Sequence, residues 1–153
     1  MTKRKTLMIR QLDKKLEQLS ALTEVSRPSG GWIKSIRTAL NMSLRQLGTR
    51  LGTNVASTNE IEQREAEGSI TIKKMNEVAK VLDMKFVYAL IPNEGTLEKM
   101  IESRARQLAI EIVLRTSQTM KLEDQQNTDA RIKDAINERT EELINELPKI
   151  LWD

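Results

Sequence analysis

Large apolar residues recur every three or four positions along most of this chain, and no other feature of the sequence constrains the fold as strongly. Leu44, Leu47 and Leu51 show this spacing in a short segment, and residues 97–113 show it in a longer one. Side chains spaced in this way share one face of an α-helix. Aromatic residues make up only 3% of the chain, so the apolar residues are mainly Leu, Ile, Ala and Met, which suit helix packing better than a sheet. We therefore expect a mainly α fold.

One segment departs from the helical pattern. Residues 84–92 (MKFVYALIP) concentrate β-forming residues and end in a proline, which predicts one short β-strand. A lone strand finds no partner for its backbone N–H and C=O groups within its own subunit, so we expect it to pair with its twin across a dimer axis. An extended arm packed on helices is the alternative. The residues expected in this dimer strand are Phe86, Val87, Tyr88, Ala89 and Leu90.

Helix breakers divide the chain. The sequence RPSGG at residues 27–31 contains Pro and paired Gly, and it predicts a hinge. We expect an N-terminal helical arm (1–29), a compact domain that ends in the strand (30–92), and a C-terminal helical region for dimerisation or partner binding (93–153). Polar turn residues at 116–129 are expected to interrupt the helices of the last part.

Two apolar features are compatible with several roles. The stripe of Leu12, Leu16 and Leu19 suits packing on the body of the protein, pairing with its twin, or folding on a partner. Trp152, next to the end of the sequence, suits either a peg that closes the last helix or an exposed anchor for another protein.

Cysteine and histidine are both absent from the chain. Their absence removes disulfides, thiol nucleophiles, most zinc sites and the commonest general base. The usual nucleotide-binding, phosphate-binding and serine-nucleophile motifs are also missing. Carboxylate chemistry would rest on pairs such as Glu123-Asp124 and Glu141-Glu142, which are typical of solvated helix faces. We expect no enzyme activity, no metal and no cofactor.

The sequence also indicates a location. No stretch approaches the roughly 20 apolar residues that are needed to span a bilayer. The start, MTKRKTLMIRQLDKK, lacks the apolar core of a secretory signal. We therefore expect a cytoplasmic, nucleoid-associated protein without membrane contact.

Positive charge is concentrated at the start of the chain. Residues 1–50 hold 11 Lys/Arg against 3 Asp/Glu, whereas residues 51–100 hold 6 against 8 and residues 101–153 hold 8 against 11. A basic segment of this size favours a polyanion such as nucleic acid as partner. A solvated basic face is the less specific interpretation.

Two short helices joined through a glycine are predicted at residues 44–63. Ser43 and Gln46 fit a capping box at the first helix, Gly52 fits a left-handed residue after it, and Asn54 fits the N-cap of the second helix. Gly48 is expected where the two helices cross closely. Thr58 and Ile61 are expected to form the inward face of the second helix. These proportions are those of a helix-turn-helix.

The outward face of the second helix carries short, mostly uncharged side chains. Such a helix can enter the major groove of DNA, which is about 12 Å wide. Asn59 and Gln63 suit bidentate bonds to adenine, Glu60 suits cytosine, and Val55 or Ala56 suits a thymine methyl group. The residues expected to read bases are Val55, Ala56, Ser57, Asn59, Glu60 and Gln63.

Phosphate contacts are expected from basic residues and helix starts near this face. The candidates are Lys34, Arg37, Ser43, Arg45, Arg50 and Asn54. Four acidic residues argue against DNA binding, because acids near a phosphate backbone lower affinity: Glu60, Glu62, Glu65 and Glu67.

The segment GWIKSIRTALNMSLRQLGTRLGTNVASTNEIEQ resembles an Xre/Cro-type helix-turn-helix. The resemblance implies a five-helix domain that binds palindromic operators as a dimer. Gly48 stands where the family usually has Ala, and Thr58 stands where it usually has Val. Val55 stands where the family commonly has Gln, so the base preference is not carried over.

The whole chain resembles the family called mobile mystery protein A. The resemblance rests on GWIKSIRTALNMSLRQLG, IEQREAEGSITI, DMKFVYALIP, MKLEDQ and the terminal LWD. It implies a gene paired with a Fic-domain protein, mobile mystery protein B, in a toxin–antitoxin-like unit. This chain would be the antitoxin-like member that binds DNA and represses its own operon.

Inhibitors of Fic enzymes often carry the helical motif [S/T]-x-x-x-E-[G/N]. Gln63 and Leu90 stand four residues before the two Glu-Gly pairs of this chain, so the motif is absent. A Fic partner would therefore be restrained through another surface or by repression alone. A protein–protein interaction module that restrains a partner enzyme without reading DNA is the alternative function.

Overall fold

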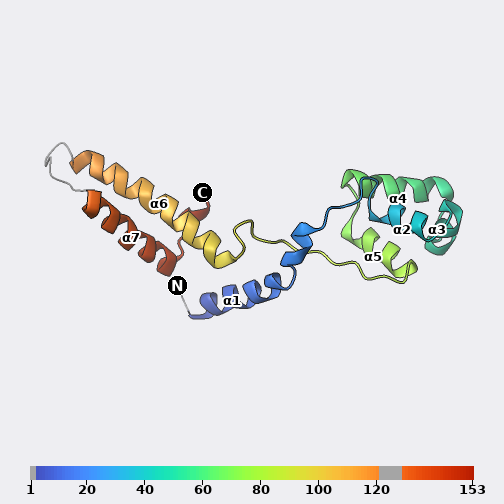
Figure 1. Cartoon of the computed structure of the whole chain (residues 1–153), viewed down its shortest axis with the longest axis horizontal. Coiled ribbons are helices and arrows are strands. Elements are labelled where there is room, and N and C mark those ends of the chain that lie inside the picture. Colours follow the sequence, from blue (N-terminus) through green and yellow to red (C-terminus); the bar gives the residue numbers. More distant parts are fainter. Residues whose placement is uncertain (1–2, 121–128) are drawn as a thin grey trace. The chain divides into compact units, whose positions relative to one another are not determined.

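The computed structural model describes residues 3–120 and 129–153, and these residues are mainly helical (Figure 1), as the apolar spacing predicts. The α-helices are α1 (Lys3–Glu17), α2 (Trp32–Ala39), α3 (Leu44–Leu51), α4 (Val55–Glu67), α5 (Ile72–Val81), α6 (Leu97–Met120) and α7 (Asp129–Glu146). Short 3-10 helices are η1 (Ser20–Glu24) and η2 (Lys149–Trp152).

The chain forms two compact units. One contains residues 24–88, and the other contains the described residues of 1–23 and 89–153. This division differs from the three parts expected from the sequence, because α1 belongs with the C-terminal helices. The Asp13 carboxylate accepts hydrogen bonds from the backbone N–H groups of Leu97 (2.7 Å) and Glu98 (3.3 Å), and it thereby caps the start of α6. Helix α1 thus packs on α6, but within the predicted stripe Leu16 and Leu19 are half-buried and Leu12 is exposed.

Helices α2–α5 build the unit of residues 24–88 around Ile33, Leu47 and Val78, which are fully buried. The predicted caps are confirmed. Ser43 and Gln46 form the capping box of α3, and the Asn54 side chain accepts a hydrogen bond from the Ser57 amide (2.7 Å) at the start of α4. These caps fix where each short helix begins and therefore how α3 and α4 meet.

Helices α6 and α7 lie side by side in the other unit (Figure 1). Their core contains Ala105, Ala109, Leu143 and Leu151, and the small alanines let the two helices approach closely. Leu151 is the buried side chain that anchors the last residues to this core, whereas half of the Trp152 side chain is exposed. Arg104 holds this end by donating to the carbonyl oxygen of Leu151 (3.0 Å).

Helix α6 extends further than the sequence predicts. It continues to Met120, so the interruption predicted at residue 116 does not begin there. The rest of that stretch, with Glu123-Asp124 and most of the MKLEDQ sequence, lies outside the described residues.

The strand predicted for Phe86, Val87, Tyr88, Ala89 and Leu90 is not present in the single chain. Residues 84–92 have neither helical nor strand structure, because no neighbouring strand supplies backbone partners. The rings of Phe86 and Tyr88 stack with centroids 5.8 Å apart, and Val87, Tyr88 and Leu90 are exposed. Pairing with a second chain stays a prediction.

Across the described residues, no helix is both long enough and apolar enough to traverse a bilayer.

Candidate nucleic-acid interface

The turn between α3 and α4 is tight, and Gly48 makes it possible. A Cβ atom on Gly48 would lie 2.7 Å from Thr58 Oγ1 and 2.8 Å from the carbonyl oxygen of Thr53. Gly52, after the end of α3, has a left-handed φ of 71°. Both glycines therefore have the roles that the sequence predicts: Gly48 allows a close helix crossing, and Gly52 caps the C-terminal end of α3.

Replacing Gly48 with Ala should lower the free energy of unfolding by up to about 2 kcal/mol, since overpacking costs about 1–3 kcal/mol and alanine regains about 1 kcal/mol of helix propensity. Urea unfolding measures the change. Thr49→Ala, at the exposed neighbouring position on α3, is the control and should stay within about 0.5 kcal/mol. A Gly48→Ala protein about 1 kcal/mol more stable than the parent, the gain from helix propensity alone, would show that α3 and α4 do not cross this closely.

The face of α4 that is expected to read bases is open to solvent. Val55, Ala56, Asn59, Glu60 and Gln63 are exposed, and Ser57 is half-buried. Thr58 is fully buried and Ile61 packs against the core, as predicted for the inward face. The structure therefore places five of the six predicted residues fully on the surface and the sixth at its edge.

The side chains on this face differ in whether they form hydrogen bonds or ion pairs within the protein. Neither Asn59 nor Gln63 forms a side-chain hydrogen bond with any other described residue, so both amides are available to a ligand. Glu60 accepts a hydrogen bond from Arg64 (2.6 Å), four residues further along α4. This exposed pair offsets the charge of Glu60 and places beside the face an arginine that was not predicted from the sequence.

Two of the four acids that argue against DNA binding point into the protein. Glu62 is 4% exposed and forms an ion pair with Arg37 of α2. Glu65 is also 4% exposed, and its Oε1 atom accepts hydrogen bonds from the backbone N–H groups of Trp32 (2.8 Å) and Ile33 (3.4 Å) at the start of α2. Only Glu60 and Glu67 of the four remain on the surface.

Arg37 is engaged inside the protein, which counts against its predicted role as a phosphate contact. Its guanidinium group binds both carboxylate oxygens of Glu62 and donates to the carbonyl oxygen of Met42 (2.8 Å). The side chain is 13% exposed. An arginine whose donors are satisfied inside the protein would have to break these bonds before it could bind DNA.

Glu65 and Arg27 hold α2 against α4, a role that was not predicted from the sequence. Gly31, the N-cap residue of α2, has no side chain that could cap the helix. Glu65 supplies the cap from α4, and Arg27 donates to the carbonyl oxygens of Glu65 (3.0 Å) and Ala66 (2.9 Å). A glycine at the helix start leaves room for this cap, since a Cβ atom on Gly31 would clash with Glu65 Oε2.

The remaining phosphate candidates fall into two groups. Lys34, Arg45 and Arg50 are exposed, and Arg50 also donates to the carbonyl oxygen of Val81 (3.3 Å). Ser43 and Asn54 use their side-chain oxygens to cap α3 and α4, so they would act by orienting the helix starts.

Lys74 of α5 adds a further cation that was not predicted from the sequence. It lines a hollow of about 210 Å³ together with Ser57, Glu60 and Arg64 of α4. Its ammonium group donates to Glu77 (2.7 Å), and this bond holds the pKa of the Glu77 carboxyl below its usual value.

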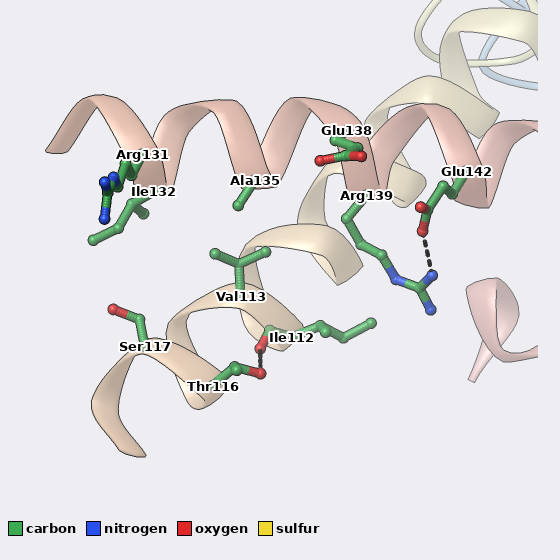
Figure 2. Close-up of a pocket in the computed structure, with 10 residues that line it drawn as sticks. All are labelled: Ile112, Val113, Thr116, Ser117, Arg131, Ile132, Ala135, Glu138, Arg139 and Glu142. Atoms are coloured by element: carbon green, nitrogen blue, oxygen red, sulfur yellow. Dashed lines mark hydrogen bonds and ion pairs between the residues drawn. The ribbon is translucent and has the colours of Figure 1, made fainter. Parts of the chain in front are cut away.

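A second hollow, of about 470 Å³, lies between α6 and α7 in the other unit (Figure 2). Ile112, Val113, Ile132 and Ala135 form its apolar part, and Arg139, paired with Glu142 (2.6 Å), lies at its charged rim. Among the described residues, no cluster of acidic side chains could hold a metal ion. Apolar side chains with a few polar groups are the usual lining of a ligand-binding hollow.

Comparison of the chain with protein-family models, with curated proteins and with solved structures found no match.

Proposed function

We propose that this protein is a sequence-specific DNA-binding transcriptional regulator with an Xre/Cro-like helix-turn-helix formed by α3 and α4. The exposed face of α4 is the observation that carries the proposal. It combines short side chains with the unengaged amides of Asn59 and Gln63, and the tight turn at Gly48 holds it in position. The burial of Glu62 and Glu65 supports the proposal further, since it removes two negative charges from this surface.

The regulator would act as a homodimer on a palindromic operator upstream of its own gene, as the resemblance to mobile mystery protein A implies. The exposed apolar residues Val87, Tyr88 and Leu90 support the prediction that residues 86–90 meet their twin. The same resemblance makes a Fic-domain protein the proposed partner, with this chain as the antitoxin-like repressor.

A footprint on the DNA upstream of the gene tests the proposal. The purified protein should protect two half-sites with their centres about 34–36 Å apart, or a multiple of this distance, because a dimer presents two recognition helices. Uniform protection, with no preference over a duplex of arbitrary sequence, would refute sequence-specific binding.

Binding should weaken steeply as salt is raised. If Lys34, Arg45 and Arg50 of both subunits each neutralise one phosphate, the logarithm of the binding constant should fall with the logarithm of salt concentration with a slope of about −5 or steeper. Fluorescence anisotropy at several salt concentrations gives the slope. A slope near zero would mean that binding does not depend on the phosphate backbone.

The hollow between α6 and α7 favours a second candidate function, an interaction module that restrains a partner enzyme (Figure 2). Co-purification with the product of the neighbouring gene tests it. Ile132→Glu places a charge in the apolar part of the hollow and should abolish co-purification under this hypothesis, while DNA binding stays unchanged. Co-purification that survives Ile132→Glu would exclude this hollow as the partner site.

A further inference from the structure

Helix α1 has two distinct faces. Thr6, Ile9, Asp13 and Leu16 are half-buried, and Asp13 on this side caps α6. The opposite side carries residues at helical spacing that are all exposed: Arg4, Leu7, Gln11, Lys14 and Lys15. We call this second side the outer face of α1. Packing on α6 therefore leaves one complete face of the helix available to another molecule.

The outer face belongs to a strongly basic helix. Helix α1 contains six Lys/Arg and two Asp/Glu, and one of these acids, Asp13, is engaged at the start of α6. Arg10 forms an exposed ion pair with Glu98 (3.6 Å). The other five basic residues have no acidic partner within the part of the chain that the structure describes: Lys3, Arg4, Lys5, Lys14 and Lys15.

Few of the predicted phosphate contacts in the unit of residues 24–88 are exposed cations. With Arg37 engaged by Glu62, the exposed members of the predicted phosphate set are Lys34, Arg45 and Arg50. The basic excess of residues 1–50 is therefore supplied in large part by α1, which lies outside the helix-turn-helix. Affinity for duplex DNA comes mainly from phosphate contacts of this kind.

We propose that the outer face of α1 is a second DNA-binding surface, which contacts the sugar–phosphate backbone without reading sequence. The inference rests on the proposed function and adds the surface that supplies much of its affinity. Charge complementarity identifies the occupant, because the three unpartnered cations of the outer face, Arg4, Lys14 and Lys15, match a phosphate backbone. A membrane-surface helix needs a broad apolar face directed outward. In α1 the apolar residues Ile9 and Leu16 are half-buried, and of the exposed apolar residues Leu7, Met8 and Leu12 only Leu7 belongs to the outer face.

The test compares two charge-matched variants of the full-length protein on a 30-base-pair duplex of arbitrary sequence. One variant is Arg4→Gln/Lys14→Gln/Lys15→Gln, and glutamine keeps the helix propensity close to that of the residues it replaces. The control is Lys99→Gln/Lys133→Gln/Lys149→Gln, which removes the same charge from exposed positions of the same unit. Anisotropy titrations over a range of salt concentrations give the slope for each protein.

The magnitude of the salt slope should fall by up to about 5 per dimer in the α1 variant, at about 0.9 for each phosphate that is no longer neutralised, and by less than about 1 in the control. The variant Arg4→Lys/Lys14→Arg/Lys15→Arg keeps the charges and should retain the parent slope, and a circular dichroism spectrum of the glutamine variant equal to that of the parent excludes a folding defect as the cause. Equal slopes for the α1 variant and the control would overturn the inference.

Two further results have meanings different from that of equal salt slopes. Equal affinity of the parent for its upstream DNA and for the arbitrary duplex would refute sequence-specific regulation. The comparison of salt slopes would still show whether the outer face of α1 contacts the phosphate backbone. Binding of the parent to vesicles with about 30% anionic lipid, abolished in the α1 variant while the DNA slope is unchanged, would assign the outer face to membranes and would overturn the proposal.

Discussion

Replacing Arg37 with Met should lower the free energy of unfolding of the unit of residues 24–88 by about 3–5 kcal/mol. The change leaves the Glu62 carboxylate, which is 4% exposed, without its cation in a site that water hardly reaches. Removing one partner of a buried ion pair has effects of this size because the remaining charge is neither paired nor solvated. It also removes the hydrogen bond to the Met42 carbonyl oxygen.

Urea unfolding followed by tryptophan fluorescence measures this destabilisation. The unit contains Trp32, so a Trp152→Phe background removes the only other tryptophan and makes the signal specific. The double variant Arg37→Met/Glu62→Leu should recover most of the stability, because an apolar pair replaces two charges. Arg139→Met, in the exposed pair with Glu142, is the control and should cost about 0–1 kcal/mol. A change below about 1 kcal/mol for Arg37→Met alone would show that the pair is solvated.

Replacing Asn59 and Gln63 together with Ala should abolish most of the discrimination between the operator and other DNA. Each good base contact contributes about 1–3 kcal/mol of discrimination, so the expected reduction is about 2–6 kcal/mol. The measurement is the ratio of affinities for the footprinted upstream DNA and for an arbitrary duplex at one salt concentration. Affinity for the arbitrary duplex should hardly change, because neither side chain carries charge.

The matched control is Gln107→Ala/Asn145→Ala, which removes the same two side-chain types from helices α6 and α7. It should leave the affinity ratio unchanged. If the Asn59/Gln63 variant selects the operator as strongly as the parent protein does, the outward face of α4 is not the reading surface. Sequence selection would then have to come from another element.

Local signals in the sequence predicted those features of the candidate site that depend on residues close together in the chain. The capping box of Ser43 and Gln46, the left-handed Gly52 and the Asn54 cap each involve residues within three or four positions of each other, so the sequence pattern reveals them directly. The same holds for the inward side of α4, where the spacing of Thr58 and Ile61 sufficed.

Features that depend on distant residues were not predictable in this way. Arg37 and Glu62 are 25 positions apart, and each has the sequence context of an ordinary surface residue until α2 packs across α4. The cap of α6 by Asp13 joins residues 84 positions apart. The strand predicted at residues 86–90 is absent from the single chain, because no second strand among the described residues supplies backbone partners, and its pairing across a dimer stays a prediction.

The attachment of α1 to α6 has a consequence for the order of events during synthesis. The ribosome completes α1 about 80 residues before the α6 start that Asp13 caps, and at about 5–20 residues per second this separation corresponds to roughly 4–16 seconds. All residues of the central unit emerge within that interval. The central unit can therefore complete its core first, while the basic N-terminal helix waits for its docking partner to be translated.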